Sequence, residues 1–148
     1  MATLIKFFHL AAAIVWMGGL AFMLFALRPA ATATLAAPQR LPLIAATLQK
    51  FFVIVWGTIT VLLLSGLAML LAVGFKNAPT GWHVMFGIGL LMFALFGHLY
   101  FGPYKRLARA VAAVDWPAGG AQVQKIATLA MVNFVLGWIA MVAVRFLA

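Results

Sequence analysis

The stretch GWHVMFGIGLLMFALFGHLYFGPY, residues 81–104, decides the fold of this chain. It is almost wholly apolar and long enough to cross a bilayer, which takes about 20 residues of α-helix. Two of the three histidines, His83 and His98, lie in it, 15 residues apart. On one helix this separation places them roughly 60° apart around the axis and roughly 22 Å apart along it. The stretch therefore predicts a membrane helix with an imidazole near each end and a face of small residues between them.

Composition extends this prediction to the whole chain. Of its 148 residues 68% are hydrophobic and 7% are charged, against roughly 25% charged in soluble domains. We expect an all-α integral membrane protein, a four-helix transmembrane bundle in one domain of residues 1–148. There are no cysteines, which excludes disulfides, iron–sulfur clusters and thiolate metal sites. Asp115 is the one acidic residue, which excludes hydrolysis by paired carboxylates and a carboxylate site for Mg²⁺ or Ca²⁺.

Hydropathy and the placement of proline and glycine predict where the four helices begin and end. We expect the first helix to end at Arg28-Pro29 and the third at Gly102-Pro103, because proline lacks the backbone N–H that continues a helix. The predicted transmembrane ranges are about 3–27, 50–75, 81–101 and 125–146.

The basic residues predict the orientation. Seven lie in or beside the first and third connections: Arg28, Arg40, Lys50, Lys105, Arg106, Arg109 and Lys125. Three lie at the opposite side: Lys6, Lys76 and Arg145. Because the side richer in Lys and Arg faces the cytoplasm, we expect a multi-pass protein of a bacterial inner membrane with both termini in the periplasm. The net charge of +9 then reflects contact with the lipid bilayer, and we expect no nucleic-acid partner.

The histidines suggest haem. The helices over 3–27 and 81–101 run in the same direction, so His9 and His83 share the outer level. Met23 follows His9 by 14 residues on the same face and matches the depth of His98. Bis-histidine and histidine–methionine pairs are both axial ligand sets of haem. Ionisable side chains within a membrane are costly and are usually functional, which supports a site.

These pairs predict a protein that binds one or two b-type haems for electron transfer or redox chemistry. The haem propionates need cations, which Lys6 on the outer side and Arg28 on the inner side can supply. A quinone or a respiratory protein is then the expected redox partner. A homodimer in which His9 faces its own copy is an alternative arrangement.

The same side chains also suit copper. Imidazole and thioether groups are good ligands of Cu(I), which predicts a site of His9, His83, His98 and Met85. Other methionines extend a path from this site: Met17, Met92 and Met131. A third hypothesis is an accessory subunit or assembly factor of a respiratory complex, with no site of its own.

Short motifs along nearly the whole chain resemble small bacterial CopD-like membrane proteins. They include Lys6-Phe-Phe-His9, Trp16-Met-Gly-Gly19, Leu27-Arg28-Pro29, Arg40-Leu-Pro42, Ser65-Gly66, His83 with Met85, His98, and Pro103-Tyr104. The resemblance implies a four-helix membrane protein of copper resistance or copper uptake.

The pattern is also distantly similar to the HemJ-type protoporphyrinogen oxidases, which implies a haem-dependent membrane oxidoreductase. His9, Trp16, Arg28, His83 and His98 match that pattern. Two positions depart from it. Met85 stands where those enzymes have a lysine, and Phe134 replaces the glutamate that follows their helix-4 asparagine, here Asn133.

Overall fold

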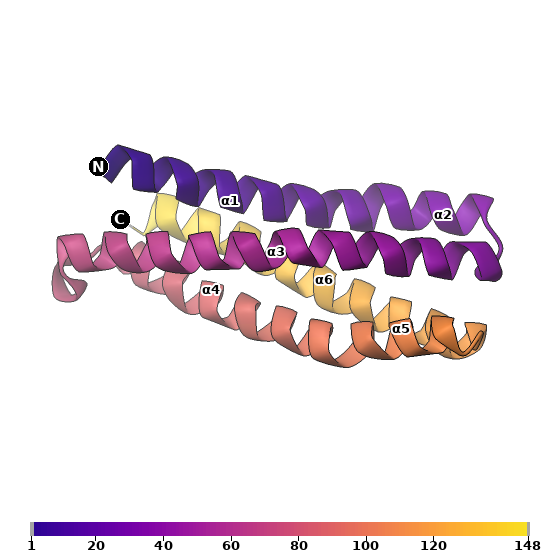
Figure 1. Cartoon of the computed structure of the whole chain (residues 1–148). Coiled ribbons are helices and arrows are strands. Elements are labelled where there is room, and N and C mark those ends of the chain that lie inside the picture. The colour runs from indigo at the N-terminus through magenta and orange to yellow at the C-terminus, as the bar shows by residue number, and fades with distance from the viewer. Residues whose placement is uncertain (1, 148) are drawn as a thin grey trace.

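Four helical rods make up the computed structural model, which describes residues 2–147 (Figure 1). The first rod joins α1 (Ala2–Phe22), a π-helical turn η1 (Met23–Leu27) and α2 (Arg28–Thr34). The second is α3 (Ala37–Val73), followed by a short 3₁₀ turn η2 (Phe75–Asn77). The third joins α4 (Thr80–Leu99), a π-helical turn η3 (Tyr100–Tyr104) and α5 (Lys105–Ala112), and the fourth is α6 (Trp116–Phe146). The prediction of an all-α protein with four apolar membrane-crossing helices is confirmed.

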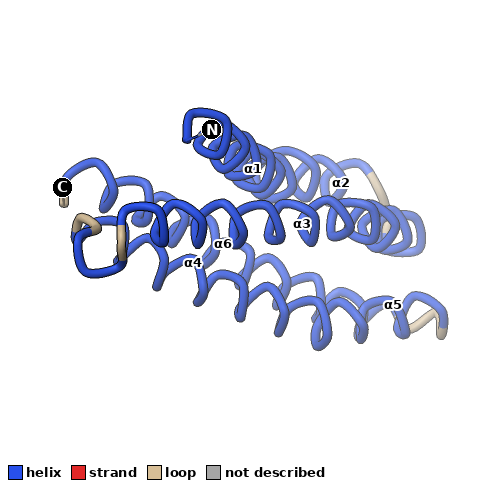
Figure 2. The backbone as a smooth tube through the Cα atoms, turned by 60° about the vertical axis from the view of Figure 1, so that its left-hand side comes forward, coloured by secondary structure: helices blue, strands red, loops and turns tan. Residues whose placement is uncertain are grey.

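The rods are longer than predicted, because proline does not end them. Pro29 falls in the first turn of α2, where a missing N–H costs nothing, and the backbone N–H of Arg28 bonds to the Met23 carbonyl across a widened turn. Pro103 lies within the π-helical turn η3. The predicted ends at Pro29 and at Gly102-Pro103 were therefore wrong. The connections are short tan segments at the two ends of the bundle (Figure 2).

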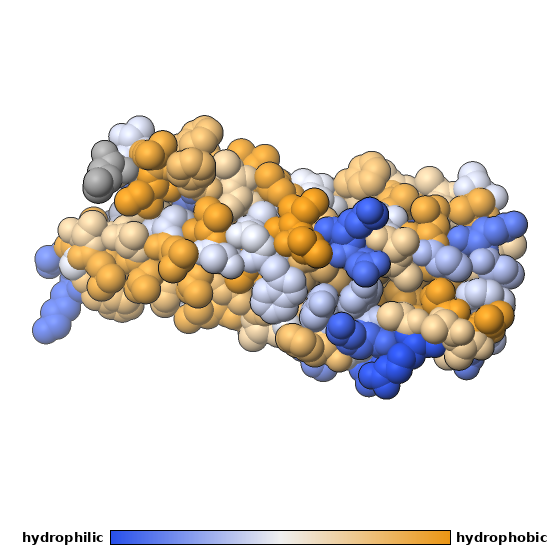
Figure 3. All heavy atoms as spheres, viewed as in Figure 1, coloured by the Kyte–Doolittle hydropathy of each residue, from blue (hydrophilic) through white to orange (hydrophobic). Residues whose placement is uncertain are grey.

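The exposed apolar side chains indicate which part of the bundle lies in the hydrocarbon core of the bilayer. All the large exposed hydrophobic residues except Leu43 and Val114 fall within 4–25, 53–75, 90–101 and 131–147. A rod of 33 residues is roughly 50 Å long, whereas the hydrocarbon core is about 30 Å thick. The remaining length carries α2, α5 and seven of the ten basic residues, and hydrophilic side chains gather toward that end (Figure 3). We call it the basic end; the two termini lie at the other end (Figure 1).

The rods pack as two antiparallel pairs, α1 with α3 and α4 with α6. Near the middle of the bundle α1 meets α4, where the Trp16 ring stacks on Phe93 with centroids 5.9 Å apart. The close approach of α4 to the end of α6 depends on a glycine at the start of α4. The Gly81 N–H donates to the Leu147 carbonyl over 2.7 Å. A β-carbon at Gly81 would lie 2.5 Å from the Ala143 carbonyl oxygen.

Gly81→Ala should therefore destabilise the bundle. The obstacle is backbone on α6, which cannot move aside as a side chain can, so we expect a loss of about 1–3 kcal/mol. Thermal unfolding of the detergent-solubilised protein measures it. Gly87→Ala is the matched control, because a β-carbon there meets nothing within 4 Å. Equal melting temperatures for the two variants would contradict the packing described for α4 and α6.

Candidate functional site

A large cavity lies between the four rods, in the half of the bundle that holds the termini. It has a volume of about 480 Å³ and receives side chains from α1, α3, α4 and α6. His9 lines it, and Lys6 stands at its rim. Five of the eight methionines also line the cavity: Met17, Met69, Met85, Met92 and Met141. We call it the methionine cavity.

His9 is held in one orientation by α3. Its ring lies on Gly66, where a β-carbon would be 3.4 Å from the His9 Cε1 atom. Its Nδ1 atom is 2.7 Å from the hydroxyl oxygen of Ser65. The Ser65 hydroxyl donates its one proton to the Val61 carbonyl over 2.5 Å, so the hydrogen-bond network assigns the donor at the other contact to His9 Nδ1–H. In the neutral ring this leaves the Nε2 lone pair free to bind a metal ion.

His83 lies outside the cavity, although it was predicted to face His9. Gly74, with a φ of 86°, ends α3 and sends the chain into the connection before α4. There the His83 Nε2 is 2.9 Å from the Phe75 carbonyl oxygen, and its Nδ1 is 3.2 Å from that of Pro79. Carbonyl oxygens only accept hydrogen bonds, so both ring nitrogens point at groups that need N–H. Both ring nitrogens therefore face the connection before α4, and neither faces His9.

Met23 and His98 are likewise not brought together. Met23 is half-buried and lines a second, smaller pocket together with Phe96 and Leu99. His98 is exposed and lies beside Gly102, on a different side of the third rod from Phe96 and Leu99. Phe96 and Leu99 lie roughly 100° or more from His98 around the helix axis, so they face the pocket that Met23 lines and His98 does not, although the three have nearly the same depth. The structure thus forms neither of the two predicted pairs.

Two methionines meet at the floor of the methionine cavity. The sulfur of Met17 rests on Gly137 of α6, in the space that a β-carbon would take. The Met92 methyl group lies 3.4 Å from the same point. Eight residues separate His9 from Met17, so the floor lies roughly 12 Å deeper than the imidazole. The cavity therefore offers an imidazole near the termini and paired thioethers against Trp16 at its base.

The other predicted residues fall in several places. Met85 lines the cavity with His9, whereas Met131 is exposed on α6. Asn133, the helix-4 asparagine of the HemJ-like pattern, donates from Nδ2 to the Met92 carbonyl over 3.2 Å. Arg28 reaches across from α2 and donates to the Gln124 side-chain oxygen on α6 over 2.6 Å.

Sequence reasoning missed four residues that line the cavity, Gly66, Met69, Gly137 and Met141, and it missed Ser65, which bonds His9. The segment over 51–75 carries no ionisable side chain that would point to a site. The Ser65-Gly66 pair was the available signal, because a hydroxyl beside a glycine in an apolar helix can hold a ring from a neighbouring helix. Between residues 2 and 147, no three His, Cys, Asp or Glu side chains converge, so a metal site here depends on thioethers.

Comparison with known proteins gives one match. The family model described as CopD, copper resistance protein D, matches residues 45–147. No curated protein and no solved structure matches the chain. The match includes α3, α4, α5 and α6, and so three of the four walls of the methionine cavity. The predicted resemblance to CopD-like proteins is confirmed, while the similarity to HemJ-type oxidases stays a prediction.

Proposed function

Because this chain belongs to the copper resistance protein D (CopD) family, we propose that it binds Cu(I) in the methionine cavity and conducts it across the membrane. One observation carries the proposal. The His9 ring has a free Nε2 and lies on a cavity lined by five methionines. In this proposal copper is the cargo of the protein and not a resident cofactor.

The chemistry of the cavity selects a soft monovalent cation. Thioether and neutral imidazole are soft ligands that favour Cu(I) over Mg²⁺ or Ca²⁺, which require oxygen ligands. The one acidic side chain, Asp115, caps α6 at the basic end, where it accepts from the Ala118 N–H over 3.1 Å. No carboxylate therefore holds a hard cation in the cavity, and a Cu(I) ion bound to thioethers keeps a single positive charge.

The depth of the cavity suggests two steps. An entering ion first meets His9 with Met85, and then Met17 with Met92 at the floor. In our proposal the termini face the periplasm and the basic end faces the cytoplasm of a bacterial inner membrane, following the excess of Lys and Arg. The cavity then opens to the periplasm, and copper moves inward.

The haem hypothesis has less support. A bis-histidine haem needs His9 and His83 on one cavity, and a histidine–methionine haem needs Met23 and His98 together. The residues present do not fit either site, because both ring nitrogens of His83 face backbone carbonyls and His98 is exposed away from Met23. His9 alone remains available as an axial ligand.

Two measurements on the purified protein test the proposal. Competition with bicinchoninate, a coloured Cu(I) chelator, should show Cu(I) bound to the protein under reducing conditions. A reduced-minus-oxidised spectrum should show no haem bands. Sharp reduced bands with a pyridine haemochrome signal would favour haem instead. Neither copper nor haem would favour an accessory subunit of a larger complex.

Ser65→Ala should weaken Cu(I) binding about tenfold. The hydroxyl holds the His9 Nδ1–H, and losing such a partner of a metal-binding histidine costs 10–100-fold in affinity. The bicinchoninate competition measures the change. Thr60→Ala is the control, because the Thr60 hydroxyl is exposed and bonds only the Trp56 carbonyl of its own helix. Equal losses in both variants would mean that the effect comes from α3 itself and not from His9.

A further inference from the structure

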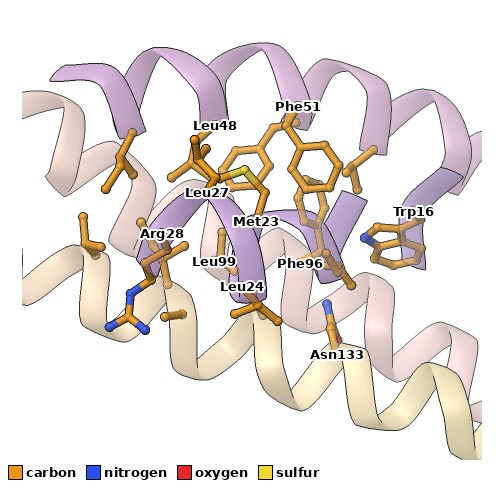
Figure 4. A pocket seen from close by; sticks show the side chains of 18 residues that line it. Trp16, Met23, Leu24, Leu27, Arg28, Leu48, Phe51, Phe96, Leu99 and Asn133 are labelled. Carbon is orange, nitrogen blue, oxygen red and sulfur yellow. The ribbon is translucent and has the colours of Figure 1, made fainter. Parts of the chain in front are cut away.

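A narrow inner crevice lies beyond the methionine cavity, toward the basic end. Trp16 lines both spaces, and the crevice runs from Trp16 to Arg28 (Figure 4). Twelve residues of helix separate these two side chains, or roughly 18 Å. The crevice has a volume of about 40 Å³, and Met23 lies between its ends (Figure 4). At its far end the Arg28–Gln124 hydrogen bond is exposed, so the crevice reaches the surface there.

Two buried polar atoms on the wall of this crevice have no partner. The Trp16 indole Nε1 and the Asn133 Oδ1 both lack a hydrogen bond, and each residue is only 2% exposed. Asn133 uses its Nδ2 for the Met92 carbonyl, which fixes the amide and leaves Oδ1 as the free end. The indole N–H can only donate and the amide oxygen can only accept. Buried polar atoms are nearly always satisfied, by protein or by ordered water.

We propose that the blind end of the inner crevice binds water, which accepts from the Trp16 indole N–H and donates to Asn133 Oδ1. A water needs roughly 10–15 Å³ of such space and at least two polar partners, and the crevice as a whole provides about 40 Å³. The other lining residues near this end, such as Leu24 and Phe96, are apolar and offer no competing partner. The water links α1 to α6, and through Asn133 to the backbone of α4.

The water site bears on the route of copper through the protein, and that route rests on the proposed function. The methionine cavity and the hydrated crevice are two chambers that approach each other from opposite ends. Trp16 forms a wall of both, and its ring stacks on Phe93 at 5.9 Å and contacts Phe96 edge-on at 6.3 Å. The closed barrier to copper is then this single aromatic layer. An ion that passes it meets water and the Met23 thioether on the far side.

Radiolytic hydroxyl labelling tests the water site without copper. Radiolysis creates hydroxyl radicals from bound water, which oxidise adjacent Met and Trp side chains, and mass spectrometry locates the products. In lipid nanodiscs we expect Met23 to be oxidised several-fold faster than Met131, which is exposed on the apolar face of α6. Trp16 should likewise exceed Trp138, which is 55% exposed on that face. Rates for Met23 and Trp16 no higher than for these two controls would overturn the proposal.

A variant separates crevice water from water in the methionine cavity, which also adjoins Trp16. Asn133→Leu removes the acceptor and keeps the number of side-chain heavy atoms, so Trp16 labelling should fall several-fold while Met85 labelling in the cavity stays unchanged. Unchanged Trp16 labelling in this variant would contradict the bridge. If Asn133→Leu does not fold, the comparison of Met23 with Met131 in the unaltered protein decides alone, because Met23 lines only the crevice. A protein with a labelled crevice and no copper binding would retain this site and lose the proposed function.

Discussion

His9→Ala should lower the affinity for Cu(I) more than about 100-fold and should reduce copper flux to the rate of protein-free liposomes. Among the described residues, His9 is the one histidine that lines the methionine cavity, and losing an outer-shell partner alone already costs 10–100-fold. Flux is measured with bathocuproine disulfonate trapped inside proteoliposomes, where the chelator reports each Cu(I) ion that enters. Affinity is measured by bicinchoninate competition on the same preparation.

The other two histidines provide matched controls. His83→Ala removes a ring that bonds the carbonyls of Phe75 and Pro79, so it should loosen the connection before α4 and leave Cu(I) affinity within a few-fold of the original. His98→Ala removes an exposed ring and should change neither binding nor flux. If all three variants lose copper equally, the ligands are not those of the methionine cavity. If none loses it, His9 is a structural partner of Ser65 only.

The fold was largely predictable because hydropathy acts on every residue of a membrane helix. Four apolar segments gave four membrane helices, as the structure confirms. Helix length was not predictable from proline alone. A π-helical turn precedes Pro29 and another contains Pro103, and such turns let the chain continue where the rule expects an end. Tertiary packing around buried residues such as Leu107 then stabilises the extra turns at the basic end.

The site was only partly predictable, because depth along a helix says little about which way a side chain points. His9 and Met85 were predicted as copper ligands, and the structure places both on one cavity. His83 has the right depth, but the connection before α4 folds back and supplies two carbonyl groups to its ring. No sequence feature of residues 75–79 predicts the contact between these carbonyl groups and the His83 ring. The residues that hold His9 are small, and small residues carry a weak signal in any apolar helix.

Gly137→Ala should abolish the floor of the cavity while leaving the fold intact. The new methyl group takes the space of the Met17 sulfur, which is the end of a flexible side chain and can swing away at little cost. Met92 also touches this point, at 3.4 Å, so both thioethers shift. We expect flux to fall on the order of 100-fold, comparable to the upper range for disturbing a metal site, with the melting temperature nearly unchanged. Replacing glycine by alanine in a helix even favours the helix by up to about 1 kcal/mol.

The decisive comparison is with glycines that face open space. Gly97→Ala makes the same chemical change where a β-carbon meets nothing within 4 Å, so it should leave flux unaltered. His9 lies roughly 12 Å from the floor, so Gly137→Ala should retain the first, histidine-dependent binding of Cu(I) and lose only its onward movement. A variant that binds copper and does not pass it would separate the two steps. Normal flux in Gly137→Ala would instead show that copper does not pass between Met17 and Met92, and would leave His9 as a binding site without a path.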